Sequence, residues 1–222
     1  MRGAPDPERD RAGMVADQLR ARGITDERVL AAMGAIPRED FVPEALRRRA
    51  YADEALGIDA GQTISQPIMV AKMTVDLAVR PGDRILEIGT GSGYQAAILA
   101  WLGARVTSLE RHAALIPAAR ARIHHLMATM EIRGRVEIRE ADGSLGDPAG
   151  APWDGIIVTA AAPTISDALR EQLGEGGRLV IPVGGRDKQM LTIVTRQGDL
   201  WLERPDGLCV FVPLIGAAGW DR

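Results

Sequence analysis

One short run, RILEIGTGSGY at positions 84–94, constrains the fold of this chain more than any other segment. An apolar stretch leads into three glycines at alternate positions, and a helix-forming stretch follows. Glycine suits such a turn because a side chain would forbid conformations with φ > 0 or would clash with a ligand. The unpaired N–H groups at the start of the following helix point at whatever lies above the turn. The run therefore predicts a strand, a tight turn and a helix that together bind a small ligand.

The spacing of the glycines distinguishes two kinds of nucleotide ligand. The dinucleotide fingerprint reads G-x-G-x-x-G and has its acidic residue well downstream. Here the third glycine, Gly93, comes one place early, and Glu87 already stands at the end of the strand. This spacing favours a nucleoside without a pyrophosphate and disfavours an NAD-dependent oxidoreductase.

Acidic side chains also follow the next two predicted strands. Glu110 ends the run that begins at Arg105, and a carboxylate at the tip of the second strand can accept both hydroxyls of a ribose. Asp142 and Gly143 follow the third strand, where a carboxylate and a flexible turn are suited to binding an adenine amino group. Three acids at three successive strand ends predict S-adenosylmethionine as the cofactor.

The chain from Arg84 onward alternates between strand and helix patterns. Hydrophobic periodicity predicts strands at 84–88, 105–109, 135–139, 155–159 and 178–182, with helices at 94–102, 113–127 and 165–173. This succession indicates an α/β fold with a doubly wound, mostly parallel sheet. The turn residues Gly198-Asp199 and Pro205-Asp206-Gly207 separate shorter apolar runs at 190–195, 200–203 and 208–214, which predict antiparallel closing strands.

The segment before the sheet reads as a helical layer. Apolar residues recur at helical spacing through the first fifty positions, Gly23 ends the first helix, and Thr25 or Asp26 caps the second. A loop at 51–62 and a helix at 67–79 follow.

The length of the chain predicts its domain organisation. With 222 residues, the whole of 1–222 is expected to form a single domain. Residues 1–79 would supply a helical extension and a lid segment, and residues 80–222 would supply the sheet core.

Charge and hydropathy argue against nucleic acid and membranes as partners of this chain. The net charge is −3 and the sequence pI is about 5.7, which gives no basic footprint for nucleic acid. No apolar run approaches the ~20 residues that a membrane helix needs, so no membrane partner is expected. The charged, proline-bearing segment 1–11 lacks the apolar core of a secretory signal, which predicts a cytoplasmic location.

Reactive side chains are few. The single cysteine, Cys209, lies in an apolar run, which predicts burial and no redox role. His112, His124 and His125 are interpreted as surface or packing residues. We expect no metal site and a monomer rather than an oligomer.

Several segments resemble one known family, the protein-L-isoaspartate O-methyltransferases, over nearly the whole chain. They are GQTISQP at 61–67, LEIGTGSGYQAA at 86–97, TAAAP at 159–163, QL at 172–173, GGRLVIPVG at 176–184 and FVPL at 211–214. The resemblance implies methyl transfer from S-adenosylmethionine to the free α-carboxylate of L-isoaspartyl residues in damaged proteins and peptides. The ester then closes to a succinimide, which hydrolyses partly to aspartate. Ile68 and Asp59-Ala60 depart from the usual pattern, where an aromatic residue and a glycine-containing pair are commoner.

The resemblance places the family's active-site serine at Ser65. A carboxylate nucleophile with a pKa near ~3.5 is ionised at neutral pH, so the site needs no general base. It needs alignment instead, and the Ser65 hydroxyl can donate to one carboxylate oxygen while the other attacks. The alternative is that Ser65 only caps the helix that begins near Pro67.

The remaining site residues are expected around this centre. The residues expected to bind the cofactor are Gln62, Thr63, Ile64, Glu87, Gly89, Thr90, Gly91, Ser92, Gly93, Glu110, Arg111, Asp142, Gly143 and Thr159. Those expected to bind the substrate are Ser65, Val70, Ala160, Ala161, Val210 and Phe211. For Val210 and Phe211 we expect main-chain contacts in the manner of strand addition, with core packing as the alternative for their side chains.

Three other functions remain open at this level. A small-molecule methyltransferase would share the same fold and cofactor. A nucleic-acid methyltransferase usually carries an aromatic residue after the fourth strand to hold a flipped base, whereas this chain has TAAAP there. A non-catalytic binder of damaged proteins is the third alternative.

Overall fold

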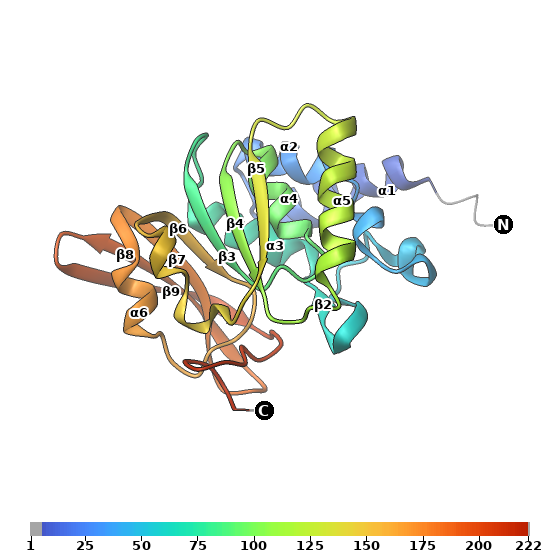
Figure 1. The fold of residues 1–222 in the computed structure, drawn as a ribbon. Helices are drawn as coiled ribbons and strands as arrows, with labels where there is room; N and C mark the ends of the chain where they lie inside the picture. The colour runs from blue at the N-terminus through green and yellow to red at the C-terminus, as the bar shows by residue number, and fades with distance from the viewer. Residues whose placement is uncertain (1–5, 222) are drawn as a thin grey trace.

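A central seven-stranded sheet dominates the computed structural model, which describes residues 6–221 (Figure 1). The first five residues of the predicted amino-terminal segment lie outside the described residues. The strand order is β5-β4-β3-β6-β7-β8-β9. The strands are β3 (Arg84–Ile88), β4 (Arg105–Glu110), β5 (Arg135–Glu140), β6 (Trp153–Val158), β7 (Leu173–Gly184), β8 (Gln189–Gln197) and β9 (Leu200–Cys209).

The sheet is parallel over one part and antiparallel over the other. β5, β4, β3, β6 and β7 run parallel, and β8 and β9 then add antiparallel strands. The register pairs Ile88 with both Leu109 and Val158, so the carboxyl ends of the three central strands meet at one edge. The predicted doubly wound architecture is confirmed.

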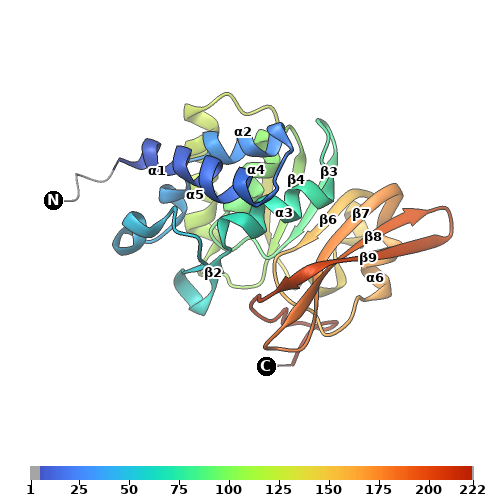
Figure 2. The same ribbon diagram turned by 180° about the vertical axis from the view of Figure 1, so that it is seen from behind.

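Side chains from opposite faces of the central strands lie in two hydrophobic cores of the described residues. In β3, Ile85 joins the larger core, whereas Leu86 and Ile88 join the smaller one on the opposite face. The helices of the larger core are α2 (Glu27–Ala35), α3 (Pro67–Leu77), α4 (Tyr94–Trp101) and α5 (Ile116–Thr129). Figure 2 shows α2, α3 and α4 in front of the sheet, while α6 (Asp167–Glu171) covers β7 from the other side.

The amino-terminal layer is helical, as predicted. It consists of α1 (Pro7–Gly13), a π-helical turn (Met14–Leu19), α2 and three 3₁₀ turns, at Arg20–Arg22, Arg38–Phe41 and Glu44–Arg49. Gly23 ends the first helical stretch with φ of 92°, a conformation that glycine adopts readily. Asp26 caps α2 by accepting hydrogen bonds from the N–H groups of Arg28 and Val29.

Two predicted boundaries near the carboxyl terminus are wrong. The runs at 200–203 and 208–214 were expected as separate strands, but β9 continues through Pro205 and ends at Cys209. A bulge accommodates the change of register, and β9 is an edge strand, where the missing N–H of proline is tolerated. Beyond Cys209 the chain leaves the sheet edge, and Pro213 forms a bridge with Ala161.

Two shorter elements also differ from expectation. The helix predicted at 165–173 is only the five-residue α6, and Leu173 already belongs to β7 because it pairs with Trp153. The loop predicted at 51–62 contains β1 (Leu56–Gly57), which pairs with β2 (Thr63–Ile64) in a small hairpin. This hairpin matters because β2 leads directly into Ser65.

Candidate cofactor and substrate cavity

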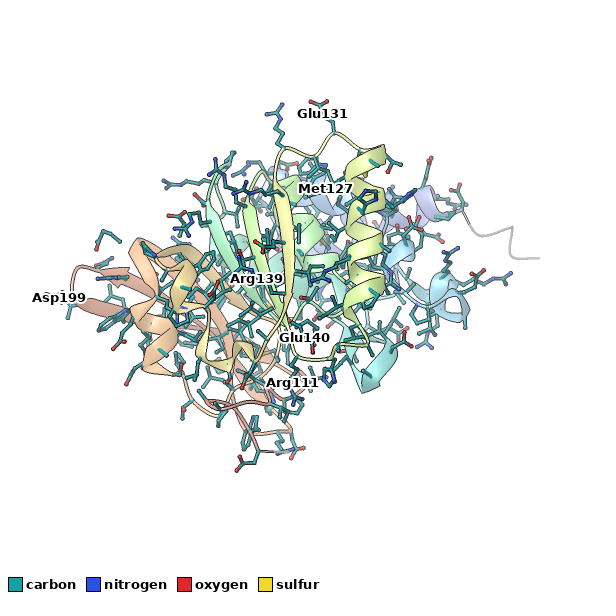
Figure 3. The ribbon with its side chains drawn as sticks, viewed as in Figure 1. Arg111, Met127, Glu131, Arg139, Glu140 and Asp199 are labelled. Carbon is teal, nitrogen blue, oxygen red and sulfur yellow. The ribbon has the colours of Figure 1, made fainter. Side chains whose placement is uncertain are left out.

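A cavity of about 340 Å³ opens at the carboxyl edge of the central strands. This volume lies in the range of small-ligand sites, which is about 300–1,000 Å³. Figure 3 shows Arg111, one of its lining residues, at this edge of the sheet, with Asp199 far away at the tip of the β8–β9 hairpin. The predicted residues that line it are Gln62, Thr63, Ile64, Ser65, Val70, Gly89, Thr90, Gly91, Ser92, Glu110, Arg111, Gly143, Thr159 and Ala160.

The glycine turn after β3 is tightly held by the neighbouring strands. Gly89 has φ of 96°, and its N–H donates to the carbonyl of Leu109 at 2.8 Å. The Thr159 hydroxyl donates to the Gly89 carbonyl at 2.7 Å, and a Cβ on Gly89 would lie only 2.4 Å from that hydroxyl. Gly93 (φ 92°) precedes the first residue of α4 and lies outside the lining. Glycine is therefore required at position 89 for both conformation and space.

Glu110 places a carboxylate on the wall of the cavity. Its side chain is buried, and its oxygens accept hydrogen bonds from the N–H groups of Gly91 at 2.9 Å and His112 at 2.8 Å. Each oxygen has two lone pairs, so the carboxylate keeps acceptor capacity for a ligand hydroxyl. The structure thus links the tip of β4 to the glycine turn through one side chain.

Glu87 is not a lining residue, which corrects the expectation of direct cofactor contact. Its side chain is fully buried beneath the turn and accepts a hydrogen bond from the Ser108 hydroxyl. Burial raises the pKa of this carboxyl to about 8. Ser108 is in turn hydrogen-bonded to Thr90, which does line the cavity. Glu87 therefore supports the turn from below.

Asp142 also differs from its expected position. Its carboxylate accepts hydrogen bonds from the N–H groups of Ser144 and Ala217, each at 2.9 Å, and the side chain lies outside the cavity lining. Its neighbours Ala141 and Gly143 line the cavity instead. Nothing in the sequence indicated that the carboxyl-terminal segment would return to this strand end and donate a hydrogen bond to the Asp142 carboxylate.

The predicted lid lies against the glycine turn. A Cβ on Gly91 would be 3.7 Å from Ile58 and 3.9 Å from the Thr63 carbonyl, so the small hairpin packs on this glycine. Ala60, at the place where the family more often has glycine, adopts a left-handed conformation with φ of 57°. The Asp59-Ala60 pair therefore keeps the left-handed backbone conformation that glycine favours.

Ser65 does not cap α3. The N-cap residue is Gln66, and its side chain makes no capping hydrogen bond. Within residues 6–221, the Ser65 hydroxyl has no hydrogen-bond partner, while its carbonyl accepts a hydrogen bond from buried Arg38 at 2.8 Å. The capping alternative is wrong, and the hydroxyl is available in the cavity.

The expected substrate residues divide into two groups. Val70 and Ala160 line the cavity, whereas Ala161, Val210 and Phe211 lie outside its lining. Phe211 packs in the larger core, and its N–H donates to the Gln189 side chain at 2.9 Å. Val210 is 73% exposed, so the core-packing alternative holds for Phe211 and fails for Val210.

Several lining residues were not among the predicted site residues, although the family segments at 61–67, 86–97 and 211–214 contain many of them. They are Gly61, Met73, Ile88, Tyr94, Gln95, Leu109, His112, Ala141, Val212, Pro213, Leu214 and Ile215. Ile88, Tyr94 and Leu109 directly adjoin predicted residues and could have been found from the strand ends. His112 follows Glu110 by two positions and lines the cavity while half-buried, so its interpretation as a surface or packing residue stays a prediction.

The described residues bear on two further expectations. Over residues 6–221, no helix is both long and apolar enough to span a membrane. Within the same part of the chain, no cluster of three or more His, Cys, Asp or Glu side chains is arranged to hold a metal ion.

Comparison with known proteins assigns the family. The family model described as Protein-L-isoaspartate(D-aspartate) O-methyltransferase (PCMT) matches residues 10–219. The chain belongs to this family. As a protein-L-isoaspartate O-methyltransferase it uses S-adenosylmethionine as the methyl donor, as the sequence predicted.

Similar proteins support the assignment over the full length. The protein-L-isoaspartate O-methyltransferase of Methanoculleus marisnigri is 52% identical over 218 residues, which covers 97% of this chain and 96% of that protein. The protein of the same name from Methylorubrum extorquens is 52% identical and covers 97% of this chain and 92% of its own length.

Solved structures share the fold. One, named protein-L-isoaspartate O-methyltransferase, has a TM-score of 0.79 and 26% identity, covering 94% of this chain and 67% of that one. Another, from Plasmodium falciparum in complex with S-adenosyl-L-homocysteine, also has a TM-score of 0.79, with 23% identity over 96% of this chain and 99% of that one.

Proposed function

We propose that the cavity holds S-adenosylmethionine over the glycine turn and admits an isoaspartyl α-carboxylate beside Ser65. The observation that carries this proposal is that one cavity of about 340 Å³ contains both the turn at 89–92 and the free hydroxyl of Ser65. Residues 1–79 would supply the helical layer and the lid, and residues 80–222 would supply the sheet that bears the turn.

The residues on the cavity wall suit a nucleoside cofactor. Glu110 offers carboxylate oxygens for ribose hydroxyls, and the turn at 89–92 brings its backbone to the cavity wall. Leu109, Ala141 and Leu214 add apolar surface suited to an adenine ring. When bound, the cofactor supplies an electrophilic methyl group on a positively charged sulfur.

The residues of the chain would then orient the nucleophile. An isoaspartyl α-carboxylate is ionised at neutral pH, so none of the lining residues has to remove a proton from it. We assign to the Ser65 hydroxyl the donation of one hydrogen bond to a carboxylate oxygen, which fixes the direction of the other oxygen. Val70 and Ala160 would border the same space. Such alignment of reactants supplies several kcal/mol of barrier reduction, up to about 7–11 in favourable models.

The acceptor that we propose is a polypeptide. The net charge of −3 gives no support to a phosphate backbone as partner, and the small side chain of Ala160 borders the cavity. We further propose that the enzyme acts as a monomer.

One experiment tests the proposed reaction directly. The protein is incubated with methyl-labelled S-adenosylmethionine and two peptides that differ only in an aspartyl or isoaspartyl linkage. We expect base-labile methyl ester on the isoaspartyl peptide alone. Equal labelling of both peptides, or labelling of neither, would contradict the proposed substrate.

A further inference from the structure

Arg38 is a buried cation behind the cavity. It is the first residue of the 3₁₀ turn Arg38–Phe41, and its side chain is 0% exposed. Its Nε donates to the Ala50 carbonyl at 2.7 Å, and its Nη2 donates to the Ser65 carbonyl at 2.8 Å. The centre of the guanidinium lies 5.1 Å from the centroid of the Tyr94 ring. The side chain thus joins the helical layer to two residues of the cavity wall.

The charge of Arg38 has no carboxylate partner within residues 6–221. Nη1 is buried without a hydrogen-bond partner, and burial lowers the pKa of the guanidinium to about 10. An unpaired buried charge is unfavourable, and apolar side chains of similar size often replace buried ions at no loss of stability. Stability alone therefore does not account for an arginine at this position.

The contacts of Arg38 lie on the two parts of the cavity that must be aligned. Ser65 stands between β2 of the lid and α3, and Tyr94 is the first residue of α4, directly after the glycine turn. Both residues line the cavity, whereas Arg38 does not. A planar guanidinium with fixed donor directions is suited to setting the distance between two such groups.

We propose that Arg38 is a positioning residue for methyl transfer, which holds the main chain of Ser65 at a fixed place relative to Tyr94 and the glycine turn. Arg38 acts through the Ser65 carbonyl and does not touch the substrate. Its loss would displace the Ser65 hydroxyl while the cofactor contacts of the turn remain. This inference rests on the proposed role of Ser65.

Arg28 provides a matched control in the same layer. From α2, its guanidinium donates to two core carbonyls, those of Val79 at 3.0 Å and Leu102 at 3.4 Å. Neither acceptor lines the cavity. Arg28→Met therefore removes the same kind of link between the layer and the core, without reaching Ser65.

The experiment compares Arg38→Met, Arg38→Lys and Arg28→Met with the wild type. Thermal unfolding checks the fold, calorimetry with S-adenosylhomocysteine measures the cofactor part of the site, and steady-state kinetics with an isoaspartyl peptide gives kcat and KM. We expect Arg38→Met to lower kcat/KM by about 10- to 100-fold through misplacement of Ser65, with S-adenosylhomocysteine affinity largely retained. Arg38→Lys, which keeps a donor for the Ser65 carbonyl, should recover part of this loss, and Arg28→Met should show none of it.

Two results would overturn the inference. One is a kcat/KM of Arg38→Met equal to that of Arg28→Met, and the other is a parallel loss of S-adenosylhomocysteine binding, which would indicate a general structural role. If Arg38→Met does not fold, Arg38→Lys is compared with Arg28→Lys. A lower kcat/KM in Arg38→Lys alone, with S-adenosylhomocysteine affinity retained, supports the inference, and an equal kcat/KM overturns it. Failure of the proposed function would appear separately, because the wild type itself would then not label the isoaspartyl peptide.

Discussion

Two parts of the cavity wall, the turn at 89–94 and the segment at 61–73, are held in place by different means. The turn is fixed by the adjacent strands, through the Leu109 carbonyl and the Thr159 hydroxyl. Around Ser65, the second part is held by the two-residue pairing of β1 with β2, by the hydrogen bond from Arg38 to the Ser65 carbonyl and by the Gln66 side chain, which donates to Asp53. The first part is therefore built into the sheet, and the second depends on the helical layer.

From this difference we expect the turn to bind the cofactor and the segment that contains Ser65 to bind the peptide. A rigid, sheet-held turn suits the cofactor, which must be bound in the same way in every cycle. A segment attached through a separate layer suits a polypeptide substrate whose surroundings vary. Substitutions in the two parts should therefore affect cofactor binding and peptide methylation separately.

The largest effect is expected for Gly89→Ala in the turn. The added Cβ would lie 2.4 Å from the Thr159 hydroxyl, and φ of 96° is unfavourable for alanine. We expect a loss of at least about 2 kcal/mol in unfolding free energy and about 100-fold in S-adenosylhomocysteine affinity. Calorimetry and denaturant unfolding measure both quantities. Gly185→Ala is the control, because nothing lies within 4 Å of its added Cβ. Normal affinity in Gly89→Ala would show that the turn is not the cofactor site.

Ser65→Ala tests the other part of the wall. Removal of the hydroxyl should lower kcat with isoaspartyl peptide by about 10- to 100-fold, because the carboxylate loses its orientation, while S-adenosylhomocysteine affinity stays normal. Ser166→Ala is the matched control, because Ser166 does cap α6 through Leu169. That variant should lose about 1 kcal/mol of stability and retain its turnover. Unchanged turnover in Ser65→Ala would remove Ser65 from the mechanism.

Glu110→Gln should give a smaller effect, confined to the cofactor. The amide replaces one of the two carboxylate oxygens that accept N–H groups of Gly91 and His112. We expect S-adenosylhomocysteine affinity to fall by about tenfold, since a charge-assisted hydrogen bond is lost, with little change in the KM for peptide. Glu140→Gln, at the exposed end of β5, serves as control. A change in peptide KM alone would contradict the division between the two parts.

The smallest effect on cofactor binding is expected beneath the turn, at Glu87, where the change is in stability and depends on pH. Burial raises the pKa of this carboxyl from 4.5 to about 8, so the folded protein keeps a proton that the unfolded chain releases above pH 4.5. The stability that Glu87 contributes is fully present below pH 4.5 and is lost as the pH rises toward 8.

Glu87→Gln cannot ionise, so its melting temperature should exceed that of the wild type at pH 8 and match it near pH 4.5. Each kcal/mol corresponds to about 2–4 °C for a chain of this size. Thermal unfolding across this pH range is the measurement. An equal pH dependence in the two proteins would show that Glu87 is ionised in the fold.

The parts of the structure that depend on local pattern were predictable. The strands β3, β4 and β5 and the glycine turn follow from runs of adjacent residues, and the family motifs placed Ser65 in the cavity. The prediction for β9 was wrong because Pro205-Asp206-Gly207 has the composition of a turn, whereas pairing with β8 carries the strand through it as a bulge. Asp142 and Glu87 were misplaced because chemical type alone does not show which neighbour occupies a carboxylate.

The sequence by itself determined the order of strands and helices, the glycine turn and the family of this protein, because these are encoded in short runs of residues. Only the tertiary structure decided that Glu87 lies below the cavity and that the Ala217 N–H donates to the Asp142 carboxylate. It also decided that Arg38 donates a hydrogen bond to the carbonyl of Ser65, 27 positions away in the sequence. The physical reason is that a buried polar group must find its hydrogen-bond partners in the folded chain, and those partners come from segments distant in sequence.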